Sequence, residues 1–335
     1  MKEMGRWRNR ETGRRILLAS SRLTVAMSAR HPVTFIGLTF VLAIAFFINL
    51  ATADSLAQSR RNGAHSTVAR ETFTPADRTL VDRAVGATCS ERVRDPFSSM
   101  AIDEMQARPS LSVNNPDAVA GVKRAERLLP ITKKLVARAL LKLARDYELY
   151  GSVYNKGKVN AAIARVQAVR RIKPDVDARD NASVWLREPH TIEFGTIFLA
   201  GLRSDEGMIS VLAHELTHIA DGQSDSLRFL FRSVARRAAT RTGLSITGQR
   251  GEELACDLVG LMATHEFIKG NASWEPPTRR LARAVEHNCV GDDTSDEDHL
   301  SPRSTIRALF ALDLEFASEI AASPNVGATK ATPSP

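Results

Sequence analysis

SDEGMISVLAHELTHIADG, the stretch from Ser204 to Gly222, decides how the rest of the chain is interpreted. Ser204 is a favourable N-cap residue, and the acidic side chains of Asp205 and Glu206 suit the positive end of a helix dipole. Gly222 is typical of a helix C-terminus. The apolar side chains between these signals form one broad face, namely Met208, Ile209, Val211, Leu212, Leu216 and Ile219. The stretch is therefore predicted to be one helix that packs against a core.

Within this predicted helix, His214, Glu215 and His218 stand in the order His-Glu-x-x-His. Side chains four residues apart project from the same side of a helix, so both imidazoles can reach one metal ion while Glu215 lies beside it. Neutral imidazoles are good zinc ligands, and zinc with an open coordination position lowers the pKa of a bound water toward neutrality. Glu215 is expected to take a proton from that water as general base. The motif thus predicts a zinc-dependent hydrolytic site.

A third protein ligand is expected in GEELACDLVG, residues 251–260, which is predicted to be a second helix. Glu253 and Asp257 are one turn apart, so one carboxylate can bind the metal while the other accepts a hydrogen bond from a ligand imidazole. Glu252 points about 100° away from Glu253 around the helix axis. It is interpreted as a solvent-facing residue.

Asp221, one turn beyond His218, is a competing candidate ligand. The pattern His-Glu-x-x-His-x-x-Gly-x-x-His/Asp requires glycine at position 221 and a ligand at position 224. This chain has Asp221 and Ser224 there, with Gly222 and Asp225 each one position late. Asp221 is therefore interpreted as a solvated residue at the end of the helix.

Two segments carry a family resemblance. Residues 195–218 combine the run GTIFLAGL, an acidic helix start and VLAHELTH, and residues 253–260 read ELACDLVG. They resemble the CAAX prenyl endopeptidase and heat-shock membrane protease family of gluzincins, whose later motif is Glu-x-x-Ala-Asp-x-x-Gly. The resemblance implies that Glu253 is the third zinc ligand and that Asp257 lies behind the imidazoles. Cys256 replaces the alanine of the family motif.

A third segment is similar to the same family more loosely. The family often has His-Pro followed by arginine five residues after the proline, and Pro302 precedes Arg307 at that spacing while Ser301 replaces the histidine. Arg307 is a candidate contact of the substrate or its transition state, with a structural salt bridge as the alternative. The resemblance covers about residues 180–315. Many family members have several membrane spans, so this chain resembles the exported soluble branch.

The expected fold class is α+β and mostly helical, a zincin-like metallopeptidase domain with a small sheet beside the His-Glu-x-x-His helix. Apolar stripes at helical spacing predict helices, and short β-branched runs predict strands. Before residue 180, one predicted helix begins at Thr74 and Pro75, and three others span 117–129, 131–150 and 159–172. The predicted strands are 184–186 and 191–199. Pro130 is expected to separate two helices. The sheet is well placed to hold an extended peptide as an added strand.

Composition divides the chain into four parts. They are a basic leader plus signal peptide or signal anchor (1–53), a linker (54–73), a helical zinc metallopeptidase domain (74–322, catalytic core about 180–315) and a disordered tail (323–335). Residues 1–32 contain eight basic and two acidic side chains, which gives +6 of the net charge of +8. The remaining residues carry only about +2, too little for a phosphate-binding surface, so no nucleic-acid partner is expected.

The uncharged run Val33–Ala53 is the candidate membrane segment. Its apolar centre, Val33–Leu50, has eighteen residues, a length that does not separate a cleaved signal from a single-span anchor. The ending Ala-Thr-Ala matches a small-residue cleavage site, and Met27 would begin a signal of ordinary size. In either case the bulk of the chain is expected to be exported, to a bacterial periplasm, and to contact the membrane only through this segment.

The cysteines Cys89, Cys256 and Cys289 fit an exported protein with at most one disulfide. They contain no Cys-x-x-Cys pair, so a cysteine-based zinc site is not expected. Cys89 with Cys289 is the predicted bridge, because Cys256 lies in a helix beside the site.

The expected function is that of an exported endopeptidase with one zinc ion per chain, acting on proteins or peptides. The family resemblance implies misfolded envelope proteins as substrates. Two alternatives are a non-catalytic, zinc-stabilised binding or chaperone-like module on the same fold, and a membrane-surface interaction protein led by the basic N-terminus. The stabiliser of the transition state is not assigned among His265, His287 and His299.

Overall fold

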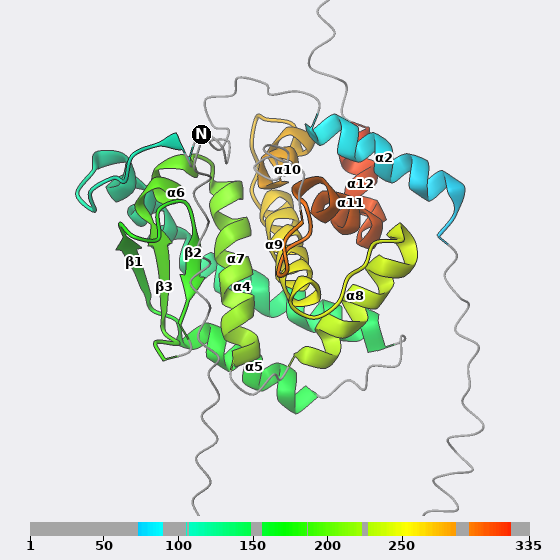
Figure 1. Cartoon of the computed structure of the whole chain (residues 1–335), viewed down its shortest axis with the longest axis horizontal. Coiled ribbons are helices and arrows are strands. Elements are labelled where there is room, and N and C mark those ends of the chain that lie inside the picture. Colours follow the sequence, from blue (N-terminus) through cyan, green and yellow to red (C-terminus); the bar gives the residue numbers. More distant parts are fainter. Residues whose placement is uncertain are drawn as a thin grey trace, which may run out of the picture. The chain divides into compact units, whose positions relative to one another are not determined.

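The computed structural model describes residues 73–89, 105, 107–148, 156–185, 187–222, 227–285 and 295–322, all within one compact unit, Val68–Pro335 (Figure 1). Its elements in chain order are α2 (Pro75–Cys89), α4 (Pro116–Glu148), α5 (Lys156–Ala168), β1 (Arg171–Asp175), β2 (Ala182–Val184), β3 (Thr191–Gly195), α6 (Thr196–Gly201), α7 (Asp205–Asp221), α8 (Arg228–Thr242), α9 (Gln249–Gly270), α10 (Pro277–Val285), α11 (Pro302–Leu312) and α12 (Leu314–Ala321). Helices dominate and one small sheet accompanies them, which confirms the predicted α+β class.

Helix α7 has the limits that its sequence predicts. The Ser204 hydroxyl accepts a hydrogen bond from the backbone N–H of Gly207 at 3.0 Å, so it caps the first turn. Gly222 ends the helix with a φ of 61°, a conformation that favours glycine. The guanidinium of Arg165 in α5 donates to the carbonyl oxygen of Ala220 at 3.0 Å and satisfies the last turn.

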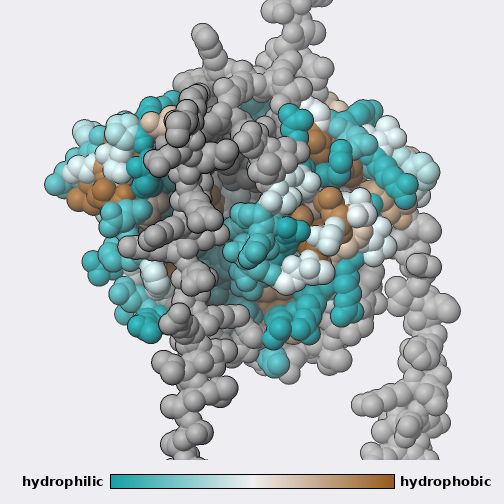
Figure 2. Space-filling view, in the orientation of Figure 1, coloured by the Kyte–Doolittle hydropathy of each residue, from teal (hydrophilic) through white to brown (hydrophobic). Residues whose placement is uncertain are grey.

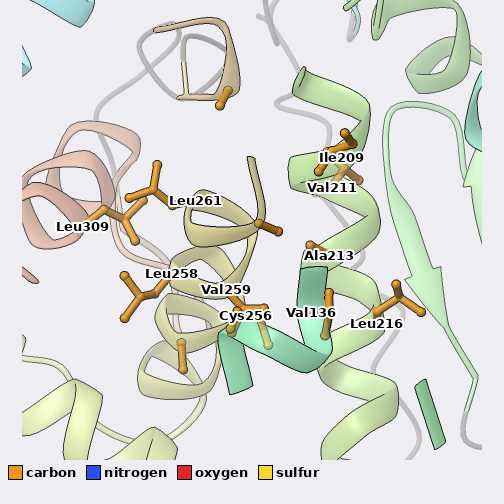
Figure 3. Close-up of a cluster of buried hydrophobic side chains, with 14 of the residues drawn as sticks. Val136, Ile209, Val211, Ala213, Leu216, Cys256, Leu258, Val259, Leu261 and Leu309 are labelled. Atoms are coloured by element: carbon orange, nitrogen blue, oxygen red, sulfur yellow. The ribbon is translucent and has the colours of Figure 1, made fainter. Parts of the chain in front are cut away.

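Helices α7 and α9 lie side by side at the centre of the described unit (Figure 1). Figure 3 shows Ala213 of α7 and Cys256 and Val259 of α9 close to Val136 of α4, in one apolar cluster. Gly260 permits the close approach, because a Cβ atom at this position would lie 2.7 Å from the carbonyl oxygen of Ser210 in α7. The apolar core therefore holds the two helices in a fixed relation.

The sheet has the strand order β1-β3-β2, with β3 parallel to β1 and antiparallel to β2. Every residue of the central strand β3 is buried. Glu193 of β3 is bound on both sides, by the Lys173 ammonium at 2.5 Å and by the Trp185 indole N–H at 2.6 Å. Strand β2 forms an edge of the sheet and contacts α7.

The predicted break at Pro130 is wrong, because α4 continues through this residue. A proline inside a helix costs about 3 kcal/mol. The apolar stripe of α4 offsets this cost, since Leu128 and Leu140 are fully buried and each contributes about 1.5–3 kcal/mol. Packing of the long helix therefore overrides the local signal.

Two further element predictions need correction. The predicted helix 159–172 ends at Ala168, and Arg171–Asp175 forms the unpredicted strand β1. The predicted strand 191–199 ends at Gly195, after which the chain forms α6. A Cβ atom on Gly195 would lie 2.1 Å from the carbonyl oxygen of Arg179, so glycine is needed where the chain turns.

Several sequence-based predictions concern residues that the structure does not describe. The leader, the apolar run, almost all of the linker, the tail, Leu186 of the predicted strand 184–186, and the side chains of a Cys89–Cys289 bridge lie outside the described residues. Within the described ranges, no helix has the length and apolar character needed to span a membrane.

Candidate metal centre

Helices α7 and α9 bring three potential ligand atoms together. The Nε2 atoms of His214 and His218 are 3.1 Å apart, and Oε2 of Glu253 lies 3.2 Å from the first and 3.3 Å from the second. These atoms form a nearly equilateral triangle, called the metal triangle below. Four ligands arranged tetrahedrally around zinc, at bonds of about 2.0–2.1 Å, are separated from one another by about 3.3 Å. The donor set and the spacing of the metal triangle therefore both suit zinc.

Glu253 is oriented by two sets of partners. Its Oε1 accepts a hydrogen bond from the Gln249 side-chain amide at 3.0 Å, one turn earlier on α9, and its Oε2 faces the imidazoles. Burial raises the pKa of Glu253, but hydrogen bonds and charge interactions with His214 and His218 outweigh burial and hold this pKa far below its ordinary value. The carboxylate is therefore ionised, as a metal ligand must be.

Asp257 lies behind the first imidazole, where the family resemblance implies it. Its Oδ1 is 2.7 Å from Nδ1 of His214. A carboxylate at Nδ1 favours the tautomer that carries the proton on Nδ1 and leaves the lone pair of Nε2 facing the metal triangle. Burial lowers the pKa of His214, yet Asp257 and Glu253 raise it well above its ordinary value.

The interpretation of Glu252 as solvent-facing is wrong. Its side chain is only 26% exposed, and its Oε1 lies 3.3 Å from Nδ1 of His218. His214 and His218 are one turn apart along α7, so adjacent residues of the facing helix α9 can serve different imidazoles. Cys256 adds a weaker contact, with its Sγ 3.7 Å from the same Nδ1 atom. In the sequence, the only indication of this second contact is that Glu252 lies next to Glu253.

Glu215 is buried in the same helix as the two histidines, with only 6% of its surface exposed. Burial raises the pKa of Glu215 above its ordinary value, against the opposing effect of both imidazoles. Within the described ranges, no hydrogen bond or ion pair engages its carboxylate. A buried carboxylate of this kind costs stability, and a raised pKa suits a group that accepts and returns a proton.

Of the unassigned histidines that the structure describes, His265 and His299, only His299 makes a contact with the metal triangle. Its Nε2 is 3.8 Å from Oε2 of Glu253, its Nδ1 is 3.3 Å from Oδ1 of Asp296, and its side chain is 59% exposed. His265 instead pairs with Glu319 of α12 at 3.0 Å, and His287 lies outside the described residues. Figure 2 shows hydrophilic side chains over α9 and the segment before α11. His299 is thus an accessible imidazole, oriented by Asp296, next to the metal triangle.

The structure pairs Arg307 with a residue remote in sequence. Its guanidinium lies 3.2 Å from the Asp82 carboxylate, which joins α11 to α2, and both side chains are half exposed or more. No contact among the described residues links Arg307 to the metal triangle. The geometry favours the salt bridge, which was one of the two predicted roles.

The interpretation of Asp221 as solvated is also wrong. Its side chain is buried, and its Oδ1 accepts a hydrogen bond from the backbone N–H of Leu227 at 2.6 Å. This bond fixes the chain at the entry to α8. Asp221 is engaged in structure, and it does not take part in the metal triangle.

The comparisons with known proteins found no match among family models, curated proteins or solved structures.

Proposed function

We propose that the chain is a zinc-dependent endopeptidase. The observation that carries the proposal is the metal triangle, whose sides of 3.1, 3.2 and 3.3 Å match tetrahedral zinc while Glu215 lies buried beside it. Zinc, when bound, supplies a Lewis acid and an acidified water. His214, His218 and Glu253 would hold the ion.

Glu215 moves the proton in the proposed reaction. Its carboxylate accepts a proton as water attacks the peptide carbonyl and then donates this proton to the leaving amine. A group in this role works best with a pKa nearer the working pH, and burial raises the pKa of Glu215 in that direction. His299, with its Nε2 3.8 Å from Oε2 of Glu253 and its side chain exposed, is suited to donate a hydrogen bond to the carbonyl oxygen as negative charge develops.

The sheet supports an extended polypeptide as substrate. Strand β2 is an edge of the sheet, and it contacts α7, the helix that carries the two histidines. A peptide can bind such an edge as an added strand. Export to the periplasm and a role in removing misfolded envelope proteins remain part of the proposal, on the predicted signal segment and the family resemblance.

The test compares Glu215→Gln with wild type in the full chain, purified in mild detergent. Both proteins are expected to contain one zinc ion, while hydrolysis of an unfolded protein falls by about 10²–10⁴-fold in the variant because the general base is lost. Glu266→Gln, on the exposed side of α9, is the matched control and should cleave normally. Equal cleavage by Glu215→Gln and wild type would reject the role of Glu215. Bound zinc without cleavage in any protein would favour the binding module instead.

A further inference from the structure

The two ligand imidazoles are held in the same way by different carboxylates. His214 has Asp257 at its Nδ1 atom, at 2.7 Å, and His218 has Glu252 at its Nδ1 atom, at 3.3 Å. The family resemblance implies the first contact. It does not imply the second, which depends on a residue that the sequence pattern placed toward solvent.

Two groups compete for the Nδ1 proton of His218. The Cys256 sulfur lies 3.7 Å away, and a cysteine sulfur is a weak acceptor. The Glu252 oxygen is closer, and a hydrogen bond to a carboxylate is roughly twice as strong as one between neutral groups. Glu252 is therefore the stronger partner of His218.

We propose that Glu252 is a positioning residue that orients His218 for zinc binding, an inference that rests on the proposed function. Its carboxylate holds the proton on Nδ1, so the Nε2 lone pair of His218 faces Oε2 of Glu253. Without it, the ring would be held only by the weaker contact with Cys256. The site then has a carboxylate behind each imidazole, which raises the basicity of both ligands.

A purely structural role is the alternative. A part-buried contact between α7 and α9 can stabilise the fold without affecting the metal, and its loss would then lower thermal stability alone. Zinc affinity and the visible spectrum of a cobalt-substituted site separate the two roles, because a structural contact leaves both unchanged in the folded protein.

The test measures zinc affinity of the full chain by competition with a chromophoric chelator, for wild type, Glu252→Ala, Glu252→Gln and Glu266→Ala. We expect Glu252→Ala to weaken zinc binding by about 10- to 100-fold and to change the cobalt spectrum, and Glu252→Gln to lie between it and wild type because the amide keeps an acceptor oxygen. In the peptidase assay with saturating zinc, kcat is expected to fall more than KM rises. Glu266→Ala removes a surface ion pair from the same helix and should match wild type in every measurement.

Zinc affinity within twofold of wild type in both Glu252 variants, with an unchanged cobalt spectrum, would overturn the positioning role. If only Glu252→Gln folds, its affinity and spectrum decide the same question. A wild-type chain that binds no zinc would reject the proposed function itself, and this outcome is visible before any variant is compared.

Discussion

Helix α7 carries two buried polar clusters that differ in their charge. In its first turn, Glu206 pairs with Arg280 of α10 at 2.6 Å, and the same guanidinium donates to the Asn271 carbonyl at 2.7 Å. Two turns later, His214 and His218 meet Glu253 in the metal triangle. The protein itself supplies a cation for Glu206. In the metal triangle, two imidazole nitrogens and one carboxylate oxygen lie within 3.3 Å of one another, a donor set that could hold a metal ion in place of the imidazole protons.

This difference separates a polar contact that is complete within the fold from the cluster to which we assign a metal. The Arg280 guanidinium donates both to the Glu206 carboxylate and to the Asn271 carbonyl oxygen, so the buried charge of Glu206 is paired. Glu253 is buried next to two imidazoles, and Glu215 is a second buried carboxylate in the same site. Burying carboxylates in this way costs stability. The first cluster should therefore be sensitive in stability assays and the second in metal-binding and activity assays.

The largest effect on stability is expected from Arg280→Met. Removing the guanidinium leaves Glu206 charged and buried, which should lower the free energy of unfolding by about 3–5 kcal/mol. Chemical denaturation measures this change. The double variant Arg280→Met with Glu206→Gln is the control and should recover part of the loss, because no uncompensated charge remains. A loss below about 1 kcal/mol for Arg280→Met would show that Glu206 does not depend on Arg280 to neutralise its buried charge.

A smaller effect is expected from Gly260→Ala, at the contact that joins α9 to α7 between the two clusters. The added Cβ would lie 2.7 Å from the carbonyl oxygen of Ser210, so the helices must separate. Overpacking of this kind costs about 1–3 kcal/mol, and zinc affinity should fall with it because Glu253 moves away from the histidines. Thermal unfolding and zinc competition measure the two effects.

Gly86→Ala is the matched control for this substitution. Gly86 lies in α2, and a methyl group added there would meet no atom within 4 Å, so alanine should leave stability unchanged or raise it by about 0.5–1 kcal/mol. Equal responses at Gly86 and Gly260 would argue against a close contact between α7 and α9.

The smallest effect is expected from Arg307→Ala. The ion pair with Asp82 joins two exposed side chains, and such pairs contribute about 0–1 kcal/mol. Peptidase activity should stay within twofold of wild type in a steady-state assay. A tenfold or larger fall in kcat/KM would instead support the substrate contact that the family resemblance suggests for Arg307.

The parts of the fold and site that the sequence predicts correctly are those fixed by local spacing. The limits of α7 follow from Ser204 and Gly222, and the meeting of His214 with His218 follows from one helical turn. The continuation of α4 through Pro130 depends on burial against other helices, which local patterns do not contain.

The environments of Glu252 and His299 likewise depend on tertiary structure. Glu252 turns toward α7 because α9 packs so closely against it, and His299 reaches the site because its segment returns to α9, where Arg250 donates to the Asp296 carbonyl oxygen at 2.9 Å. Residue type and spacing identify these side chains as candidates at most. Their roles become visible only when the helices are placed together.

The proposed zinc site is tested most directly by the amount of zinc bound per chain after dialysis, measured by elemental analysis for wild type and Glu253→Ala. The metal triangle predicts one zinc ion in wild type and a large loss in Glu253→Ala, with both proteins folded by circular dichroism. A folded wild-type chain without stoichiometric zinc, or a Glu253→Ala variant that retains zinc at wild-type affinity, would contradict the account.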